Sequence, residues 1–261
     1  MKNYLLTISY DGTDYHGWQR QNGQTTVQES LEEALRGLFN CEVTATASGR
    51  TDEGVHALKQ AVSFMADTSV PTEKIPAALN GILPPDIRAI DCMEVPDGFC
   101  ARKSAKRKTY AYRFYISPTP HPHLERYALR VDNLDTSAMR KACEAVVGTH
   151  DFSNFYCLGS SAKTTVRTVY SCELREYAPQ GTTPAVMELE ICGNGFLYKM
   201  VRLIAGALIR VGKGEISVGD FVAAVEKKCE NRKIPAPSKG LTLVKVEYDD
   251  VGEQGENNFG S

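Results

Sequence analysis

Hydrophobic and polar residues along the first hundred positions repeat with two different periods. Apolar side chains at every second position predict strands, whereas apolar side chains at every third or fourth position predict helices. Thr26 and Glu29 form a capping-box pair before one predicted helix, and Thr72 is a candidate cap for another. The predicted order is β-α-β-β-α-β, with strands at 2–10, 41–48, 57–66 and 86–95 and helices at 27–39 and 72–82.

The rest of the chain repeats this order with one helix added. Gly148 is expected to end the first helix of this part, and Ser217 with Asp220 is expected to cap the added one. The predicted strands are 107–117, 165–177, 185–193 and 241–248, and the predicted helices are 136–148, 197–212 and 217–228.

Two β-α-β-β-α-β units predict an α+β fold of two ferredoxin-like halves. Their antiparallel sheets are expected to join edge to edge and to leave a basic active-site cleft between the halves. We therefore divide the chain into an N-terminal half, 1–105, which carries the loop with Asp52, and a C-terminal half, 106–248. Residues 249–261 lack an apolar pattern and are predicted to form a disordered acidic tail.

Composition narrows the class of protein. The 261 residues are 42% hydrophobic and 24% charged, which is an ordinary globular balance. The sequence has no apolar stretch of roughly 18 residues or more, so no membrane span is predicted. The start, MKNYLLTISYDG, alternates like a strand rather than a signal peptide, which indicates a cytoplasmic protein. The eight cysteines include no CxxC pair, so reduced thiols are expected and no metal site is predicted.

The charge distribution matters more than the net charge of −2. Residues 101–108, ARKSAKRK, contain five basic side chains and no acid, and residues 198–213 are basic as well. A nearly neutral protein with segregated basic segments can present a basic face to a nucleic acid. On charge alone, a solvated surface is the favoured explanation of these segments.

The segment SGRTDEGVH, residues 48–56, is the first candidate for chemistry. It lies between two predicted strands and is therefore a loop, where functional side chains are common. Asp52 follows Arg50, and a carboxylate beside an arginine stays ionised and can act as a nucleophile or a base. The plainer alternative is an aspartate that only stabilises a turn.

Several standard chemistries find no support. The sequence has neither a GxSxG elbow nor a Walker A loop, and Gly193-Asn194-Gly195 lacks the third glycine of a dinucleotide fingerprint. Asp52 and His56 could serve a hydrolase, but no serine motif accompanies them. Nothing in the sequence calls for a metal or an organic cofactor.

Three further segments could contribute to a site. In KRKTYAYRF, Lys106, Arg107 and Lys108 could hold phosphates, and Tyr110 is the aromatic residue nearest to them. Arg202 stands in an apolar helix and needs a carboxylate partner unless it reaches solvent. YDGTDYHGWQRQ contains Trp18 and Gln19, which could contact a substrate or belong to a packed loop.

Taken together, these segments resemble the tRNA pseudouridine synthase A family. The resemblance rests on YDGTDYHGWQRQ, GRTDEGVHALKQ, ARKSAKRKTYAYRF, GTHDFSNF, NGFLYKMVRLIAGALIRVGKG and APSKGLTLVKVEY, in this order. It covers the chain from about residue 4 to residue 248. GRTDxGVHA is the most specific of these motifs.

The resemblance implies an activity and a set of residues. The family isomerises uridine to pseudouridine at positions 38 to 40 of the tRNA anticodon arm, without cofactor or metal, and its members act as homodimers. Asp52 corresponds to the nucleophile, Tyr110 to the tyrosine that stacks on the target base, and Arg202 to the arginine that pairs with the aspartate. Arg50 is expected to hold a phosphate or to prop open the flipped-out state.

Rival functions remain open at this point. The same scaffold could serve a non-catalytic tRNA-binding protein or an RNA chaperone, because ferredoxin-like sheets with exposed aromatic rings bind single-stranded RNA. Asp52 argues against a pure binder, since a carboxylate in an RNA groove weakens binding. A hydrolase that uses Asp52 and His56 is the third alternative.

Overall fold

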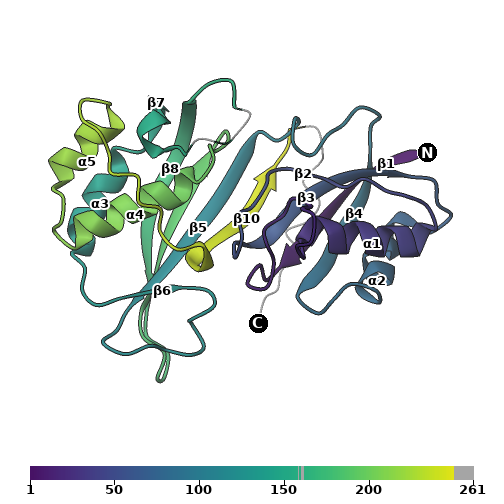
Figure 1. Ribbon diagram of the computed structural model, residues 1–261, viewed down its shortest axis with the longest axis horizontal. Helices are drawn as coiled ribbons and strands as arrows, with labels where there is room; N and C mark the ends of the chain where they lie inside the picture. Colours follow the sequence, from purple (N-terminus) through teal and green to yellow (C-terminus); the bar gives the residue numbers. More distant parts are fainter. Residues whose placement is uncertain (158, 160–161, 250–261) are drawn as a thin grey trace.

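The computed structural model describes residues 1–157, 159 and 162–249, which form one ten-stranded sheet with helices (Figure 1). The strands of the first half are β1 (Lys2–Tyr10), β2 (Thr46–Ala47), β3 (His56–Ala66) and β4 (Ile87–Val95). Its helices are α1 (Val27–Phe39) and α2 (Ile75–Asn80), with a 3₁₀ turn, η1 (Thr72–Lys74), before α2.

The second half has six strands, three α-helices and two 3₁₀ turns. The strands are β5 (Arg107–Ile116), β6 (Leu129–Val131), β7 (Gly148–Asp151), β8 (Val166–Tyr177), β9 (Val186–Gly193) and β10 (Leu241–Glu247). The helices are α3 (Thr136–Glu144), α4 (Met200–Gly212) and α5 (Val218–Val225), and the 3₁₀ turns are η2 (Phe152–Phe155) and η3 (Ser238–Gly240).

Both halves have the strand order of a ferredoxin-like unit. In the first half the order is β4-β1-β3, with β2 paired to β3 on the far side, and neighbouring strands are antiparallel. In the second half the order is β10-β5-β9-β8, and β7 extends the edge. In each unit the first and third strands are therefore central, as the two predicted β-α-β-β-α-β patterns require.

The halves join through a short parallel contact between β3 and β10, which lie side by side at the centre of Figure 1. His56 faces Thr242, and Ala57 faces Leu243. Each of these strands is the edge of its own unit at this point, so the contact converts two small sheets into one. The predicted edge-to-edge joining is confirmed.

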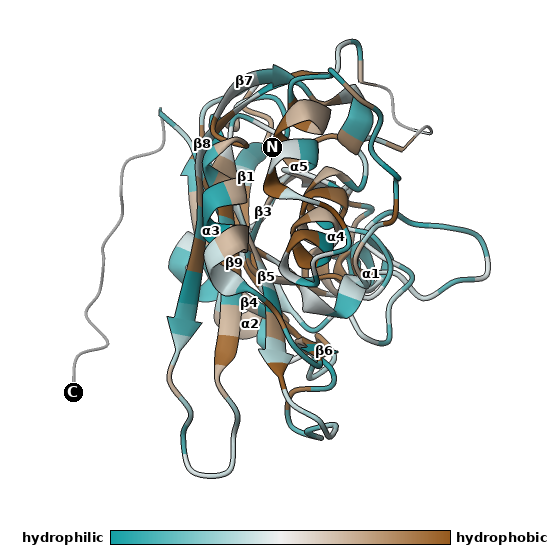
Figure 2. Cartoon of the chain, turned by 90° about the vertical axis from the view of Figure 1, so that its left-hand side faces the viewer, coloured by the Kyte–Doolittle hydropathy of each residue, from teal (hydrophilic) through white to brown (hydrophobic). Residues whose placement is uncertain are grey.

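The helices cover one face of this sheet and create the main core. Figure 2 shows α1 and α4 on the same side of the strands. Leu6 of β1 and Val62 of β3 are fully buried in the cluster beneath the helices, while their neighbours Leu5 and Ala61 belong to a smaller cluster. Because successive strand residues point to opposite faces, this smaller cluster lies on the other side of the sheet.

Helix α4 begins at Met200 rather than at residue 197, and α5 ends at Val225 rather than at residue 228. Apart from such shifts at the ends of elements, local details differ from the predicted pattern in four places. Only Thr46–Ala47 of the predicted strand 41–48 pairs with a neighbour. Thr72 begins the 3₁₀ turn and does not cap it; the capping residue is Pro71, without a side-chain hydrogen bond. Helix α3 ends at Glu144 because Gly148 already starts β7. The sequence pattern did not reveal β6 and β7, which are only three and four residues long.

Other predictions lie outside what the fold tests. The division of the chain at residue 105 stays a prediction. The predicted tail lies, from residue 250 onward, outside the described residues. Within the described part of the chain, no helix has both the length and the apolar character to cross a membrane.

Candidate active site

A large cavity opens where the two halves meet. Its volume is about 1100 Å³, which exceeds the usual volume of a small-molecule site. The first half contributes Gln19 and the loop 48–55 between β2 and β3, and the second half contributes Tyr110 and the segment 196–202 at the start of α4. Both halves are therefore needed to form its walls.

Asp52 and Arg202 meet in this cavity. The guanidinium Nη1 of Arg202 donates a hydrogen bond of 2.7 Å to Oδ2 of Asp52, and Nε of Arg202 donates to the carbonyl of Ala236 at 2.8 Å. The two side chains are 20% and 13% exposed, so the pair is poorly solvated but open to a ligand. The structure thus joins two residues that are 150 positions apart in the chain, as the resemblance implies. Arg202 does not reach out to solvent.

The loop that carries Asp52 is held against the segment 12–18 by the backbone. The amide of Trp18 donates to the carbonyl of Thr51 at 3.0 Å, and the amide of Gly54 donates to the carbonyl of Tyr15 at 3.3 Å. Gly17 has φ = 84°, and a β-carbon at this position would lie 2.7 Å from the oxygen of Thr51. Both the conformation and the close approach therefore require glycine at position 17.

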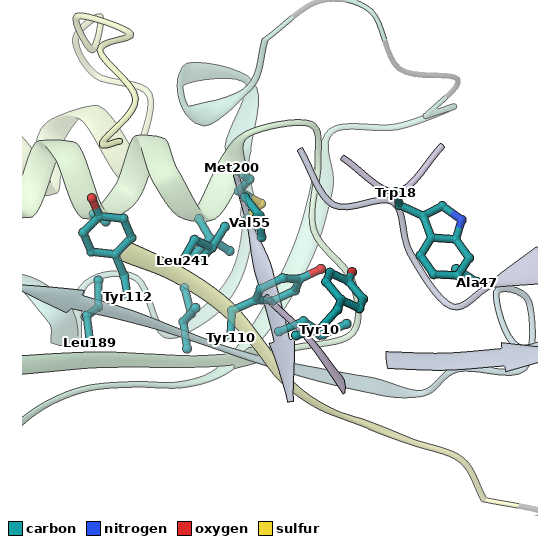
Figure 3. Packing of buried hydrophobic residues seen from close by; sticks show 14 of the residues in the cluster. Tyr10, Trp18, Ala47, Val55, Tyr110, Tyr112, Leu189, Met200 and Leu241 are labelled. Carbon is teal, nitrogen blue, oxygen red and sulfur yellow. The ribbon is translucent and has the colours of Figure 1, made fainter. Parts of the chain in front are cut away.

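Tyr110 forms part of the cavity wall from β5. Its ring lies edge-on to Phe196, with ring centroids 5.3 Å apart and an interplanar angle of 87°. Figure 3 shows Tyr110 beside Tyr10. Burial, followed by the neighbouring Tyr10 and Asp52, raises the pKa of Tyr110, so its hydroxyl stays protonated. Tyr110 can therefore offer a ring surface and a neutral hydroxyl, but not a negative charge.

Basic side chains dominate the cavity lining. Asp52, Glu53 and Glu125 are its acidic residues. The basic residues are Arg50, Arg102, Lys108, Arg126, Arg167, Lys199, Arg202 and Lys239. Within the described residues, five of these eight have no carboxylate partner, namely Arg50, Arg102, Lys108, Arg167 and Lys199. Unpaired cations in a cavity favour a polyanionic ligand.

Lys108 is one of the half-buried cations of the cavity. Its ammonium donates to the carbonyl of Ser48 at 2.5 Å, and Gly49 leaves the space that it occupies. Burial, and to a smaller extent the positive charge of Arg102, lowers the pKa of Lys108 to about 8. The ammonium is thus charged at neutral pH, and it is poorly compensated by the protein.

Lys106 and Arg107 were also predicted to bind substrate, but they do not line the cavity. Lys106 pairs with Asp249 at 3.0 Å, and the guanidinium of Arg107 lies 4.9 Å from the ring centre of Tyr170. Arg107 and Lys108 are successive residues of a strand, so they point to opposite faces of the sheet. Arg102 lines the cavity in their place.

Gln19 and Trp18, which were both predicted to contact substrate, lie in different surroundings. Gln19 lines the cavity and donates to the side chain of Gln28 at 2.8 Å. Trp18 is only 2% exposed, and Figure 3 shows it over Ala47, apart from the ring of Tyr110. Trp18 was predicted to contact substrate, and this is wrong, because its ring is enclosed in the core. Tyr112 and Phe114 are also fully buried, as expected.

His56 does not form a catalytic pair with Asp52. Its Nδ1 accepts a hydrogen bond of 3.1 Å from the amide of Gly12, and its Nε2 lies 3.0 Å and 3.2 Å from the carbonyls of Arg126 and Lys239. Nε2 must therefore carry the proton, and both ring nitrogens are occupied. His56 ties the first half to the second, and the hydrolase alternative loses its base.

Two features of the site were not predicted from the sequence. Phe196 orients Tyr110, although it belongs to the motif NGFLYKMVR that carried the resemblance. Glu125, Arg126 and Lys239 line the cavity, and Lys239 pairs with Glu125 at 2.9 Å. Among the described residues, no three His, Cys, Asp or Glu side chains gather as metal ligands would.

The geometry supports a definite kind of chemistry. A carboxylate that is hydrogen-bonded to an arginine can attack or deprotonate a neighbouring group. The adjacent aromatic ring can hold a planar group against it, and the surrounding cations can hold phosphates. This combination fits a reaction on a nucleotide within a nucleic acid.

Comparisons with known proteins point the same way. A sequence profile described as tRNA pseudouridine synthase matches residues 6–102 and 142–249. The protein named tRNA pseudouridine synthase A from Caldicellulosiruptor bescii is 42% identical over 250 residues, which are 95% of this chain and 100% of that protein. The protein of the same name from Acetivibrio thermocellus is 41% identical with the same coverage.

Similarity to solved structures is weak. The crystal structure of the archaeal box H/ACA sRNP Nop10-Cbf5 complex shares 10% sequence identity, with a TM-score of 0.35. It covers 90% of this chain and 58% of that one. A similarity this low bears neither on the fold nor on the function.

Proposed function

Because the chain belongs to the tRNA pseudouridine synthase family, we propose that it isomerises uridine to pseudouridine in tRNA with Asp52 as the nucleophile. The observation that carries the assignment of Asp52 is its ion pair with Arg202 inside the basic cavity, next to Tyr110. In a cavity that binds a polyanion a carboxylate opposes binding, so Asp52 has no evident use there unless it takes part in the reaction.

In the proposed reaction the uridine first leaves its stack and enters the cavity. This costs a few kcal/mol, and stacking on the ring of Tyr110 returns part of that cost. Arg50 is exposed beside Asp52 and binds a phosphate or holds the space left by the flipped base. Lys108 and Arg102 bind the backbone of the RNA on the other side of the loop.

The chemistry exchanges one glycosidic bond for another. The bond between N1 and C1′ breaks, the uracil turns, and a bond forms between C5 and C1′. The hydrogen on C5 leaves to water, and N1 gains a proton, so the reaction is an isomerisation. Asp52 supplies the carboxylate for these steps, at C1′ or C6 or as a base, and any bond that it forms with the substrate breaks again before the product leaves. Arg202 holds this carboxylate in place through its hydrogen bond. The residues present need no metal or organic cofactor for these steps.

We further propose positions 38 to 40 of the anticodon arm as the target. The relatives named tRNA pseudouridine synthase A are matched along their whole length, and the motifs of the segment 48–60 support the same assignment. The protein is proposed to act as a homodimer in the cytoplasm. Because one chain already forms the cavity, a second copy would extend the surface for the tRNA. No observation favours a non-catalytic tRNA-binding protein.

Release of tritium from uridine C5 tests the proposed function. Unmodified tRNA labelled at C5 of its uridines is incubated with the protein, beside a tRNA in which cytidines replace the uridines at positions 38 to 40. We expect release from the first tRNA and none from the second. Equal release from both would contradict the assigned positions, and no release from either would contradict the activity.

A further inference from the structure

The four residues before Asp52 are fixed by side chains from the sheet below them. Ser48 and Gln60 are fully buried, and Tyr10 and Thr51 are 3% and 7% exposed. Gln60 belongs to β3, and Tyr10 is the last residue of β1. Polar side chains at such depth are costly unless their hydrogen bonds are satisfied.

Gln60 satisfies its hydrogen bonds almost entirely with this one segment. Its Nε2 donates to the carbonyl of Gly49 at 2.9 Å, and its Oε1 accepts from the hydroxyl of Ser48 at 2.7 Å. A carbonyl can only accept, so the contact with Gly49 fixes which end of the amide is the NH₂ group. The second N–H of Gln60 then reaches the hydroxyl of Tyr10 at 3.4 Å.

Tyr10 connects Gln60 to Thr51, the residue next to Asp52. Its hydroxyl lies 2.8 Å from Oγ1 of Thr51. Because the oxygen of Tyr10 accepts from Gln60, its proton is free to be donated to Thr51. Burial raises the pKa of Tyr10 to about 12, so the hydroxyl keeps that proton at neutral pH. The chain of contacts therefore runs from Gln60 through Tyr10 to Thr51.

We propose that Gln60 and Tyr10 are positioning residues, which hold the backbone from Ser48 to Thr51 so that Asp52 meets the target uridine. This inference rests on the proposed role of Asp52. Arg50 lies within the same segment, yet its side chain is exposed and makes no hydrogen bond or ion pair with the described residues. The backbone is thus fixed on both sides of Arg50, while its side chain stays available to the RNA.

Kinetics can separate positioning from simple stability. Gln60→Met removes the amide at similar size, and Tyr10→Phe removes only the hydroxyl. Displacing a reacting group by about 1 Å can cost about 100-fold in rate, so we expect that loss for Gln60→Met in single-turnover tritium release. The loss for Tyr10→Phe should be smaller. The dissociation constant for tRNA should stay within about twofold, because neither side chain contacts the RNA.

Asn80→Leu provides a matched control. Asn80 also uses both ends of its side-chain amide to hold the backbone, but it does not line the cavity. Its Nδ2 donates to the carbonyl of Ala89 and its Oδ1 accepts from the amide of Ala89, both at 2.8 Å. This variant should lose thermal stability as Gln60→Met does, but it should keep the rate of the wild type.

Hydrogen exchange gives a second readout that does not depend on activity. The amides of residues 49–52 should exchange faster in Gln60→Met than in the wild type, and they should be unchanged in Asn80→Leu. An unchanged rate in Gln60→Met, an equal loss of rate in Asn80→Leu, or unchanged exchange at 49–52 would each overturn the proposal. If Gln60→Met exchanged faster at residues 49–52 but the wild type released no tritium, Gln60 would still hold this segment. The proposed function would then be contradicted.

Discussion

The two halves of the molecule share a strand order but use the same connection differently. In each half, eight residues join the second strand of the unit to the third: 48–55 between β2 and β3, and 178–185 between β8 and β9. The first of these connections lies in the cavity and carries Asp52. The second is a hairpin that projects from the sheet at the bottom of Figure 1.

The difference lies in what surrounds each connection. Residues 178–185 are exposed or half-exposed, and the hairpin is closed by backbone hydrogen bonds between Gln180 and Thr183. The segment 48–51 is held by side chains from the sheet beneath it. A ferredoxin-like unit therefore does not by itself define a site. The site exists where one connection is anchored and the other half supplies its partners, Arg202 and Tyr110.

Among the substitutions that test this difference between the halves, removing Arg202, the partner of Asp52, should lower the reaction rate the most. Arg202→Met leaves the carboxylate of Asp52 without the hydrogen bond that holds it in place. Loss of one stabilising donor in an active site costs about 100- to 1000-fold in rate, and we expect a loss in this range. Single-turnover tritium release measures it.

Arg210→Met is the matched control for this experiment. Arg210 lies on the same helix, and its Nε pairs with Glu215 at 3.3 Å, outside the cavity lining. A rate for Arg202→Met close to that of Arg210→Met would show that the pairing with Asp52 does not matter for the reaction.

Removing the ring at position 110 should have the next largest effect. Base-to-aromatic stacking contributes about 1–3 kcal/mol, so Tyr110→Ala should slow the reaction by about 5- to 150-fold. Tyr110→Phe keeps the ring and should retain most of the rate. If Phe and Ala were equally slow, the hydroxyl rather than the ring of Tyr110 would be the important group.

The pH dependence of RNA binding tests the role of Lys108. Because its pKa is lowered to about 8, Lys108 is charged below this pH and loses its charge as the pH rises further. Bound phosphates favour the charged form, so the affinity for tRNA should fall several-fold between pH 7 and 9. Arginine stays charged throughout this range, and the fall should be smaller in Lys108→Arg. Identical pH profiles would remove Lys108 from the binding surface.

A substitution in the hairpin of the second half should have the smallest effect of these changes on stability and on the rate of tritium release. Thr183→Ala removes a side chain but keeps the backbone hydrogen bonds with Gln180, so the free energy of unfolding should change by less than about 0.5 kcal/mol. The rate of tritium release should not change. A marked loss of rate in this variant would mean that both connections, and not one, serve the reaction.

Much of the fold could be predicted from the period of the hydrophobic pattern. Helix α1 and strand β1 have the bounds that were predicted, because long amphipathic segments give a clear signal. Strand β2 is shorter than predicted. Val43, Ala45 and Ala47 are all buried, but only Ala47 is paired with the neighbouring strand. Burial alternates along this segment, but the alternation does not require a full ladder of hydrogen bonds.

The site was harder to predict than the fold. The pairing of Asp52 with Arg202 joins distant parts of the chain, and only the resemblance to a family implied it. Trp18 was misjudged because the polar residues around it in the sequence hide the packing of its ring beside Tyr10 and Ala47. The different faces of Arg107 and Lys108 follow from strand geometry, and this signal was available in the sequence. Gln60 gave a signal as well, as a polar residue in an apolar strand.

The most direct test of the account is tritium release by Asp52→Asn beside the wild type, with the affinity for tRNA measured on both. Asparagine has nearly the same shape but cannot supply the charged carboxylate, so we predict bound tRNA and no release. Release by Asp52→Asn at a rate near that of the wild type would contradict the role of Asp52, and with it the view that the anchored connection 48–55 is the centre of the reaction.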